Sequence, residues 1–200
     1  MKFPQLTNLF QRRKERLYTP PERGQEDIFP FEAIDMRQIP LNVQELLESK
    51  RKHESRFSFS AVHPWEESLK VEQPGITSYI ATHSLDYAKS RMSHFVDFIS
   101  GKIAGESTIV HSEMLQGKHT PYPEWTATTE SSDFQRRGLA ERRLALMHAY
   151  CKRAYGASLY SSPDVRYEAR KLWQKLQRDG RAKTADSLDR KGRKRFQFLK

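Results

Sequence analysis

The chain has 200 residues and a mass of 23.5 kDa, which is enough for one ordinary domain with an arm and too short for two full-sized cores. Its net charge of +10 and pI near 9.7 favour an anionic partner: a nucleic acid, a phosphorylated cofactor, an acidic protein or a membrane surface. No stretch reaches the roughly 18 consecutive apolar residues that cross a membrane, and no apolar signal-peptide segment follows Met1. We therefore expect a cytoplasmic protein whose single cysteine, Cys151, forms no intrachain disulfide.

The excess positive charge belongs to the last third of the chain. Residues 133–200 carry 19 Lys and Arg against 7 Asp and Glu, whereas residues 1–132 carry 16 against 18. Such asymmetry points to the segment that meets the anion. A solvated helical face rich in Lys and Arg gives the same count, so charge alone leaves both interpretations open.

The first thirty residues are predicted to form an extended arm. A charged run over residues 11–16 is followed by the helix-breaking sequence Thr19-Pro20-Pro21-Glu22-Arg23-Gly24. We interpret residues 1–30 as an N-terminal arm that docks a partner.

Residues 31–94 are predicted to be the N-terminal part of the domain. A helix is expected from Leu41 to about Lys50. Alternating apolar and small polar residues over positions 57–62 predict a half-buried strand, and positions 76–80 predict a second one. Ser84 is typical of a helix start, and the residues at helical spacing behind it are Leu85, Ala88, Met92 and Phe95. A second helix is therefore expected from Ser84.

Strands are predicted to follow. The β-rich runs 94–99 and 103–111 flank Ser100-Gly101-Lys102, which indicates a hairpin. Residues 124–130 are rich in Trp and Thr and predict another strand.

The next segment has the form of a phosphate-binding loop. It reads Gln135-Arg136-Arg137-Gly138-Leu139-Ala140 and opens a helix whose buried stripe is Ala140, Leu144, Met147, Cys151 and Ala154. A helix start leaves backbone N–H groups without intrahelical partners at the positive end of the helix dipole. Gly138 allows close approach to the backbone, and the arginines attract a negative ligand. The segment therefore predicts a phosphate site.

This hexapeptide resembles the Q/R-x-x-G-x-G/A motif of the GNAT superfamily of acyl-CoA N-acyltransferases, with Gln135, Gly138 and Ala140 at its defined positions. The segments behind it follow the order of that family. They are a strand over residues 157–162, a helix from Pro163 that contains a sequence similar to the family's A-x-x-L-Y-x-K-L, a turn at Gly180 and a last strand near 193–198. The resemblance covers about residues 95–200, and residues 1–90 show none.

The resemblance implies an α+β fold with a mixed, mostly antiparallel central sheet flanked by helices. It also implies acetyl-CoA as co-substrate, admitted by a splayed pair of parallel strands. Its pyrophosphate would be held by backbone amides of the motif, whose cofactor-binding residues are Gln135, Arg136, Arg137, Gly138, Leu139 and Ala140. Some members place a catalytic Glu on the strand before the motif, which here corresponds to Glu124. Glu130 and His119 are its rivals as the base.

One position departs from the family pattern. Trp173 stands where many members have a Tyr that acts as general acid, and an indole N–H is no acid at neutral pH. Packing in the core is the simplest role for Trp173. Either Tyr160 or Tyr167 then replaces the acid, or the thiolate leaves without one, or the protein does not catalyse the transfer.

Two functions are consistent with these observations. The first is an N-acetyltransferase that moves an acetyl group from acetyl-CoA to an amine on a protein or RNA-linked acceptor, with the surplus basic charge facing a nucleic acid or acidic protein. The second is a catalytically inactive protein of the same fold with a structural or nucleic-acid-associated role, such as a phage particle component. No metal site is expected, because the seven histidines show no HxH or HxxxH pairing.

Overall fold

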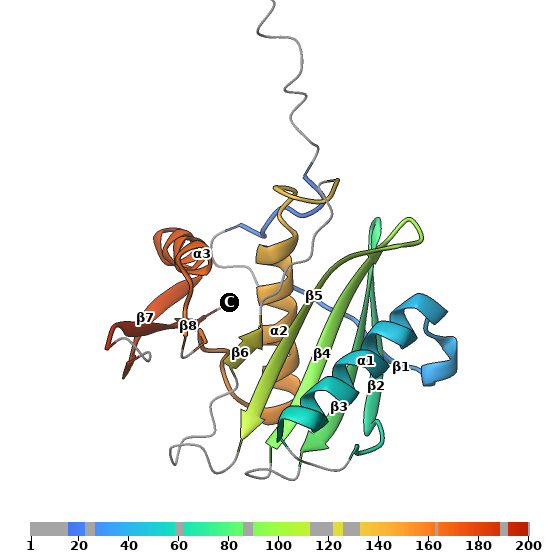
Figure 1. Ribbon diagram of the computed structural model, residues 1–200. Helices are drawn as coiled ribbons and strands as arrows, with labels where there is room; N and C mark the ends of the chain where they lie inside the picture. Colours follow the sequence, from blue (N-terminus) through green and yellow to red (C-terminus); the bar gives the residue numbers. More distant parts are fainter. Residues whose placement is uncertain are drawn as a thin grey trace, which may run out of the picture.

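The computed structural model describes residues 16–22, 27–58, 62–85, 90–112, 122–125, 133–162, 164–188 and 192–199. In this part of the chain, six strands form one antiparallel sheet in the order β1-β2-β3-β4-β5-β6, and β7 and β8 form a second, two-stranded sheet (Figure 1). The expected α+β fold, with a largely antiparallel sheet flanked by helices, is confirmed.

The strands are β1 (Phe31–Ala33), β2 (Glu67–Gln73), β3 (Ile76–Leu85), β4 (Ser90–Ile99), β5 (Lys102–Ser112), β6 (Tyr122–Trp125), β7 (Ala182–Leu188) and β8 (Lys194–Phe198). The helices are the 3-10 helix η1 (Met36–Gln38) and the α-helices α1 (Leu41–Ser58), α2 (Leu139–Tyr155) and α3 (Tyr167–Arg178). Among the described residues, no helix is both long and apolar enough to span a membrane.

Both faces of the central sheet are covered. Successive side chains of a strand point to opposite faces, so each strand contributes to two cores. Ile80, Phe95 and Ile109 of β3, β4 and β5 belong to the core that α2 covers. Tyr79, Ala81 and Val96 pack on the other face, against Val43 and Leu47 of α1. The two helices therefore sandwich the sheet (Figure 1).

This double coverage explains one wrong prediction. The region from Ser84 is not a helix, since β3 runs to Leu85 and β4 starts at Ser90. Every residue of β4 from Met92 to Asp97 is buried. The strand therefore lacks the alternation of apolar and polar residues that is typical of a strand with one solvent-exposed face. The helical spacing of Leu85, Met92 and Phe95 is therefore coincidental.

A second prediction was wrong at the end of α1. Phe57 and Ser58 continue that helix instead of starting a strand, and residues 59–61 lie outside the described part of the chain. No proline or glycine interrupts the sequence between Leu41 and Ser58, so nothing local stops the helix. The predicted hairpin of residues 94–111 is confirmed as β4 and β5, which pair from Ser90 with Ser112 to Ile99 with Lys102.

The C-terminal elements join the same core. The expected strand over residues 157–162 is reduced to a short ladder, in which Ser161 N–H donates to Phe196 O at 2.8 Å and Phe198 N–H donates to Leu159 O at 2.8 Å. The helix expected from Pro163 begins at Tyr167, and β8 confirms the last strand. Trp173 of α3 packs in the core beneath β8.

Candidate functional site

The predicted phosphate loop forms the entry to α2. Residues 133–136 make a turn, Gly138 is the N-cap of the helix with φ of 87°, and Arg136 also has a left-handed φ of 61°. A left-handed backbone is uncommon for a residue other than glycine and recurs at functional sites. The side chains of Gln135 and Arg136 are exposed and that of Arg137 is half-buried. The loop therefore presents polar side chains outward at the positive end of a 17-residue helix.

Leu139 fixes the start of this helix in the core. Its side chain is 1% exposed and packs with Ile76, Ile99, Ala104 and Phe134, at the end of the sheet where β3 starts, β4 ends and β5 starts. Arg142 N–H donates to Gly138 O at 3.0 Å, so the first turn is regular. Because Leu139 faces inward, its side chain is not available to a ligand.

The N-terminal segment of residues 16–22 crosses this helix start. Leu17 N–H donates to Arg137 O at 3.1 Å. A Cβ built on Gly138 would lie 2.8 Å from the Tyr18 carbonyl oxygen. The sequence predicted that a ligand would lie close to the backbone of Gly138. On this side of Gly138, the backbone of Tyr18 occupies that position instead. No local signal in the sequence predicts this contact between residues 120 positions apart.

A network of buried charges ties the same segment to α2 and α3. Tyr18 Oη donates to Asp27 Oδ1 at 2.6 Å, and Arg181 contacts both Asp27 and Tyr18. Arg181 Nη1 also lies 3.1 Å from Glu141 Oε1 in the first turn of α2. Burial, followed by the hydrogen bond to Asp27, raises the pKa of Tyr18, so the phenol stays neutral and donates. Lys175 of α3 completes the network through Glu141.

A second buried cluster anchors α2 to the sheet. Asp97 of β4 lies 3.0 Å from Arg142 Nη1 and 2.9 Å from Arg143 Nη1, and all three side chains are at most 1% exposed. Ser78 Oγ donates to Asp97 at 2.6 Å, and Arg142 Nε donates to Gln73 at 2.7 Å. A buried carboxylate shared by two guanidinium groups is costly to break, so the cluster sets how α2 sits on the sheet.

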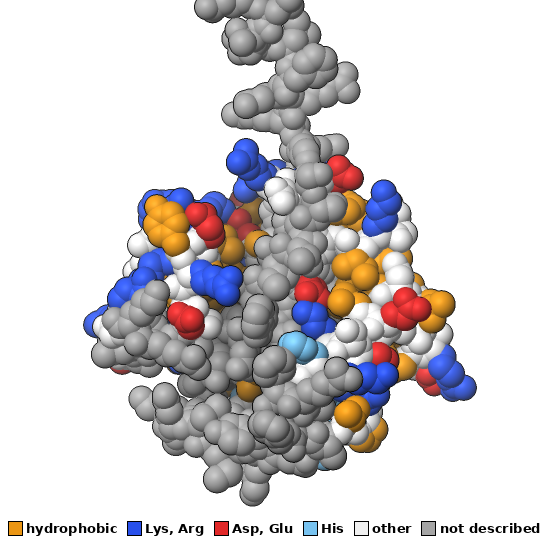
Figure 2. Space-filling model, viewed as in Figure 1, with side chains coloured by type: hydrophobic (Ala, Val, Ile, Leu, Met, Phe, Trp, Pro, Cys, Tyr) orange, Lys and Arg blue, Asp and Glu red, His pale blue; other side chains and the backbone are white. Residues whose placement is uncertain are grey.

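These contacts account for part of the excess positive charge. Within the described part of residues 133–200, four arginine side chains are buried: Arg142, Arg143, Arg181 and Arg195. Exposed cations remain on α3 and β7, among them Lys171, Arg178 and Lys183, and Figure 2 shows lysine and arginine side chains over this part of the molecule. The charge count therefore overstates the surface that is available to a polyanion.

Glu124 lies on β6, which precedes the loop of residues 135–140 in the chain. Trp125 pairs with Thr108 and Pro123 pairs with Ile109, so Glu124 is the extra residue of a β-bulge opposite β5. Bulges are frequent next to active sites because they disrupt the ladder locally. The rival residues Glu130 and His119 lie outside the described part of the chain.

Trp173 packs in the hydrophobic core. It is 3% exposed, stacks on Phe196 with ring centroids 6.0 Å apart and meets Phe198 edge-on. Of the possible replacement acids, Tyr167 is 70% exposed at the start of α3, and Tyr160 is half-buried and bridges to Gln197. Cys151 is fully buried and burial raises the pKa of its thiol, so it is no nucleophile.

Two histidines that are separate in sequence contact each other on the neighbouring strands β3 and β4. His83 Nε2 lies 3.2 Å from His94 Nε2, and the rings stack 5.4 Å apart beneath Trp65. Burial lowers the pKa of His94 to about 3, with a smaller effect from His83 beside it. Across the described residues, no three His, Cys, Asp or Glu side chains gather in a way that could hold a metal ion.

No protein-family model, curated protein or solved structure matches this chain.

Proposed function

We propose that the protein is an N-acetyltransferase that moves an acetyl group from acetyl-CoA to an amine. The observation that carries the proposal is the entry to α2. There the Gln135–Ala140 loop turns through two left-handed residues into a long helix, whose first side chain is locked in the core. The order of elements around it supports the resemblance that the sequence carries. A β-strand precedes the loop, and α2, a short ladder and α3 follow it, with the unexpected β7 before the expected last strand β8.

The pyrophosphate of the cofactor would be held by backbone N–H groups of residues 136–140. Helix N-termini attract anions through these groups and through the dipole. Since Tyr18 occupies the Cβ side of Gly138, the anion would approach from the side of the exposed Gln135 and Arg136. The exposure of Gln135 and Arg136 supports this orientation, with residues 16–22 as a neighbouring wall.

In the reaction, the nitrogen of a neutral amine attacks the thioester carbonyl, a C–N bond forms and the C–S bond breaks. A base takes the proton that the amine loses, and coenzyme A leaves as a thiolate. We assign the base to Glu124, whose bulge sets it apart from the regular ladder of β5 and β6. Because Trp173 is built into the core, no acid is assigned there.

A second candidate function is favoured by one contact. The Tyr18 carbonyl oxygen against Gly138 also suits a protein that has kept the fold without binding CoA, in a structural or nucleic-acid-associated role. The buried arginines reduce the support for an extended nucleic-acid surface. Amines on a protein or on an RNA-linked acceptor should therefore be tested together with other classes of amine.

Thermal unfolding with acetyl-CoA, desulfo-CoA and AMP separates these functions. We expect both CoA species to raise the Tm and AMP to do so weakly. Arg136→Glu reverses a charge at the proposed site and should abolish the shift, whereas the matched control Lys152→Glu, exposed at the far end of α2, should keep it. Absence of stabilisation by every CoA species, together with no coenzyme A released from the denatured protein by mass spectrometry, would overturn the proposal.

Glu124→Gln then tests the chemistry apart from binding. We expect acetyl-CoA stabilisation to persist and the transfer rate to fall by about 100- to 10,000-fold, the usual contribution of a general base. An unchanged rate would remove Glu124 from the mechanism. Binding of acetyl-CoA without transfer to any amine, lysine peptide or aminoacyl-tRNA would favour the inactive alternative.

A further inference from the structure

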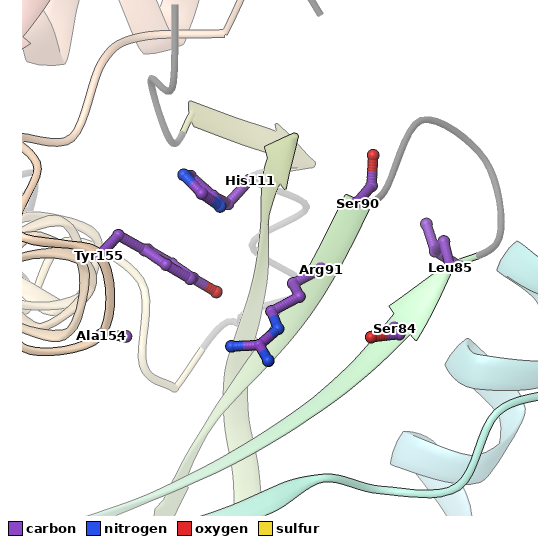
Figure 3. A pocket seen from close by; sticks show the side chains of 7 residues that line it. All are labelled: Ser84, Leu85, Ser90, Arg91, His111, Ala154 and Tyr155. Atoms are coloured by element: carbon purple, nitrogen blue, oxygen red, sulfur yellow. The ribbon is translucent and has the colours of Figure 1, made fainter. Parts of the chain in front are cut away.

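A polar cavity of about 530 Å³ lies at the opposite end of α2 from the phosphate loop. It opens between the last turn of this helix and the adjoining ends of β3, β4 and β5 (Figure 3). Its volume is that of a small-molecule site. The residues that line it are Ser84, Leu85, Ser90, Arg91, His111, Ala154 and Tyr155.

One wall of the cavity carries a cation. Figure 3 shows the Arg91 side chain reaching from its strand into the space between Tyr155 and Ser84. Its Nε lies 3.3 Å from Glu66 Oε2, and Ser84 Oγ donates to the other oxygen of the same carboxylate. The side chain is 55% exposed, so its planar fork is accessible to a ligand. Such a fork matches the two oxygens of a carboxylate.

The facing wall is aromatic. His111 and Tyr155 stack with ring centroids 4.0 Å apart and planes inclined by 10°. Burial raises the pKa of Tyr155, so its hydroxyl stays protonated. Leu85 and Ala154 add apolar surface nearby. The cavity thus combines a cationic end with a surface for an aromatic or aliphatic group.

Strand register relates the cavity to the strand of the proposed base. His111 follows Val110 on β5, and Val110 pairs with Tyr122, two residues before Glu124. The phosphate loop, in contrast, is separated from the cavity by the whole of α2, which is about 25 Å long at 1.5 Å per residue. An acceptor in the cavity would therefore meet the acetyl end of an extended cofactor and leave its pyrophosphate end undisturbed.

We propose that this cavity binds the acceptor, and that the acceptor is a small amine that carries a carboxylate, with Arg91 as the residue that determines this specificity. The inference rests on the proposed function for the identity of the reaction. The carboxylate pairs with the guanidinium of Arg91, and the remainder of the molecule packs on the ring of His111 or Tyr155. The amine is then left to point toward β6.

Matched acceptor pairs test the inference in the full-length protein. The pairs are phenylalanine against 2-phenylethylamine and leucine against 3-methylbutylamine, which differ only in the carboxylate. We expect the wild-type protein to acetylate the amino acids with the lower KM. Arg91→Gln should raise the KM for the amino acids by about 10- to 100-fold, the range for a lost hydrogen bond to a charged group, with little change in kcat. The KM of the amines should stay as it is.

Glu66→Gln is the complementary variant. It removes the carboxylate that competes for Arg91 and keeps an acceptor for the Ser84 hydroxyl, so it should lower the KM for the amino acids. Both substitutions are expected to leave the acetyl-CoA Tm shift unchanged, because the phosphate loop is remote. An equal effect of Arg91→Gln on amino acids and amines would overturn the inference.

The outcomes distinguish this inference from the proposed function. If acetyl-CoA binds and only a lysine peptide or an aminoacyl-tRNA is acetylated, the inference fails and the proposed function stands. If no CoA species binds, while phenylalanine stabilises the wild-type protein and not Arg91→Gln, the proposed function fails and the carboxylate site stands.

Discussion

A Gly138→Ala substitution measures how tightly the N-terminal segment is packed on the start of α2. The new Cβ would lie 2.8 Å from the Tyr18 carbonyl oxygen, a distance at which one of the two backbones must move. Tyr18 cannot yield easily, because Leu17 is hydrogen-bonded to Arg137 and the Tyr18 hydroxyl to Asp27. The left-handed backbone costs alanine about 1–2 kcal/mol, and the overlap adds about 1–3 kcal/mol.

Gly156→Ala is the matched control at the other end of the same helix. Gly156 has φ of 62°, and a Cβ there meets no atom within 4 Å, so only the backbone term of about 1–2 kcal/mol applies. Urea unfolding of both variants gives the two losses from the midpoints at a common m value. Equal losses in the two variants would refute the reasoning, since the Tyr18 contact would then contribute nothing.

Three further results are expected. Because His94 has a pKa of about 3 when folded and near 6.5 when unfolded, its contribution to stability is complete above pH 6.5 and is lost as the pH falls toward 3. Stability measured by urea unfolding should therefore fall, between pH 6 and 4, by about 1 kcal/mol per pH unit more in the wild type than in His94→Gln. Asp97→Asn leaves Arg142 and Arg143 without their buried counter-charge and should cost about 3–5 kcal/mol of unfolding free energy. Cys151 should react with a thiol reagent such as DTNB only after denaturation.

Each of these results has a control or a contrary outcome. Glu168→Gln removes an ion pair with Lys171 whose two side chains are mostly exposed, so it should change stability far less than Asp97→Asn. Parallel stability-against-pH curves for the wild type and His94→Gln would show that this histidine is not buried in its neutral form. Rapid labelling of the native protein would place Cys151 outside the core.

Periodic and local signals predicted the parts of the fold that depend on them. Of the predicted stripe of α2, Leu144, Met147 and Cys151 are buried, whereas Ala140 is half-buried and Ala154 is exposed. The turn at Ser100-Gly101 joins β4 to β5 as expected. Strands buried on both faces lose their alternation, so β3 and β4 were interpreted in part as a helix from Ser84.

For the candidate site, the loop of residues 135–140 was found from sequence because its chemistry is continuous along the chain. The cavity around Arg91 and Tyr155 was not found, since its residues come from β3, β4, β5 and α2, and only pairing of the strands brings them together. The contact between Tyr18 and Gly138 likewise depends on tertiary structure, and neither residue type predicts that the other will be its neighbour.

The bond network of Arg181 has a consequence for synthesis of the chain. Its partners Tyr18 and Asp27 precede it by 163 and 154 residues. At about 5–20 residues per second, translation needs roughly 8 to 30 seconds to reach Arg181 after Tyr18. Residues 16–22 therefore cannot be anchored by this arginine until it has been translated. A segment that is translated early thus completes its contacts only after a residue more than 150 positions later has been made.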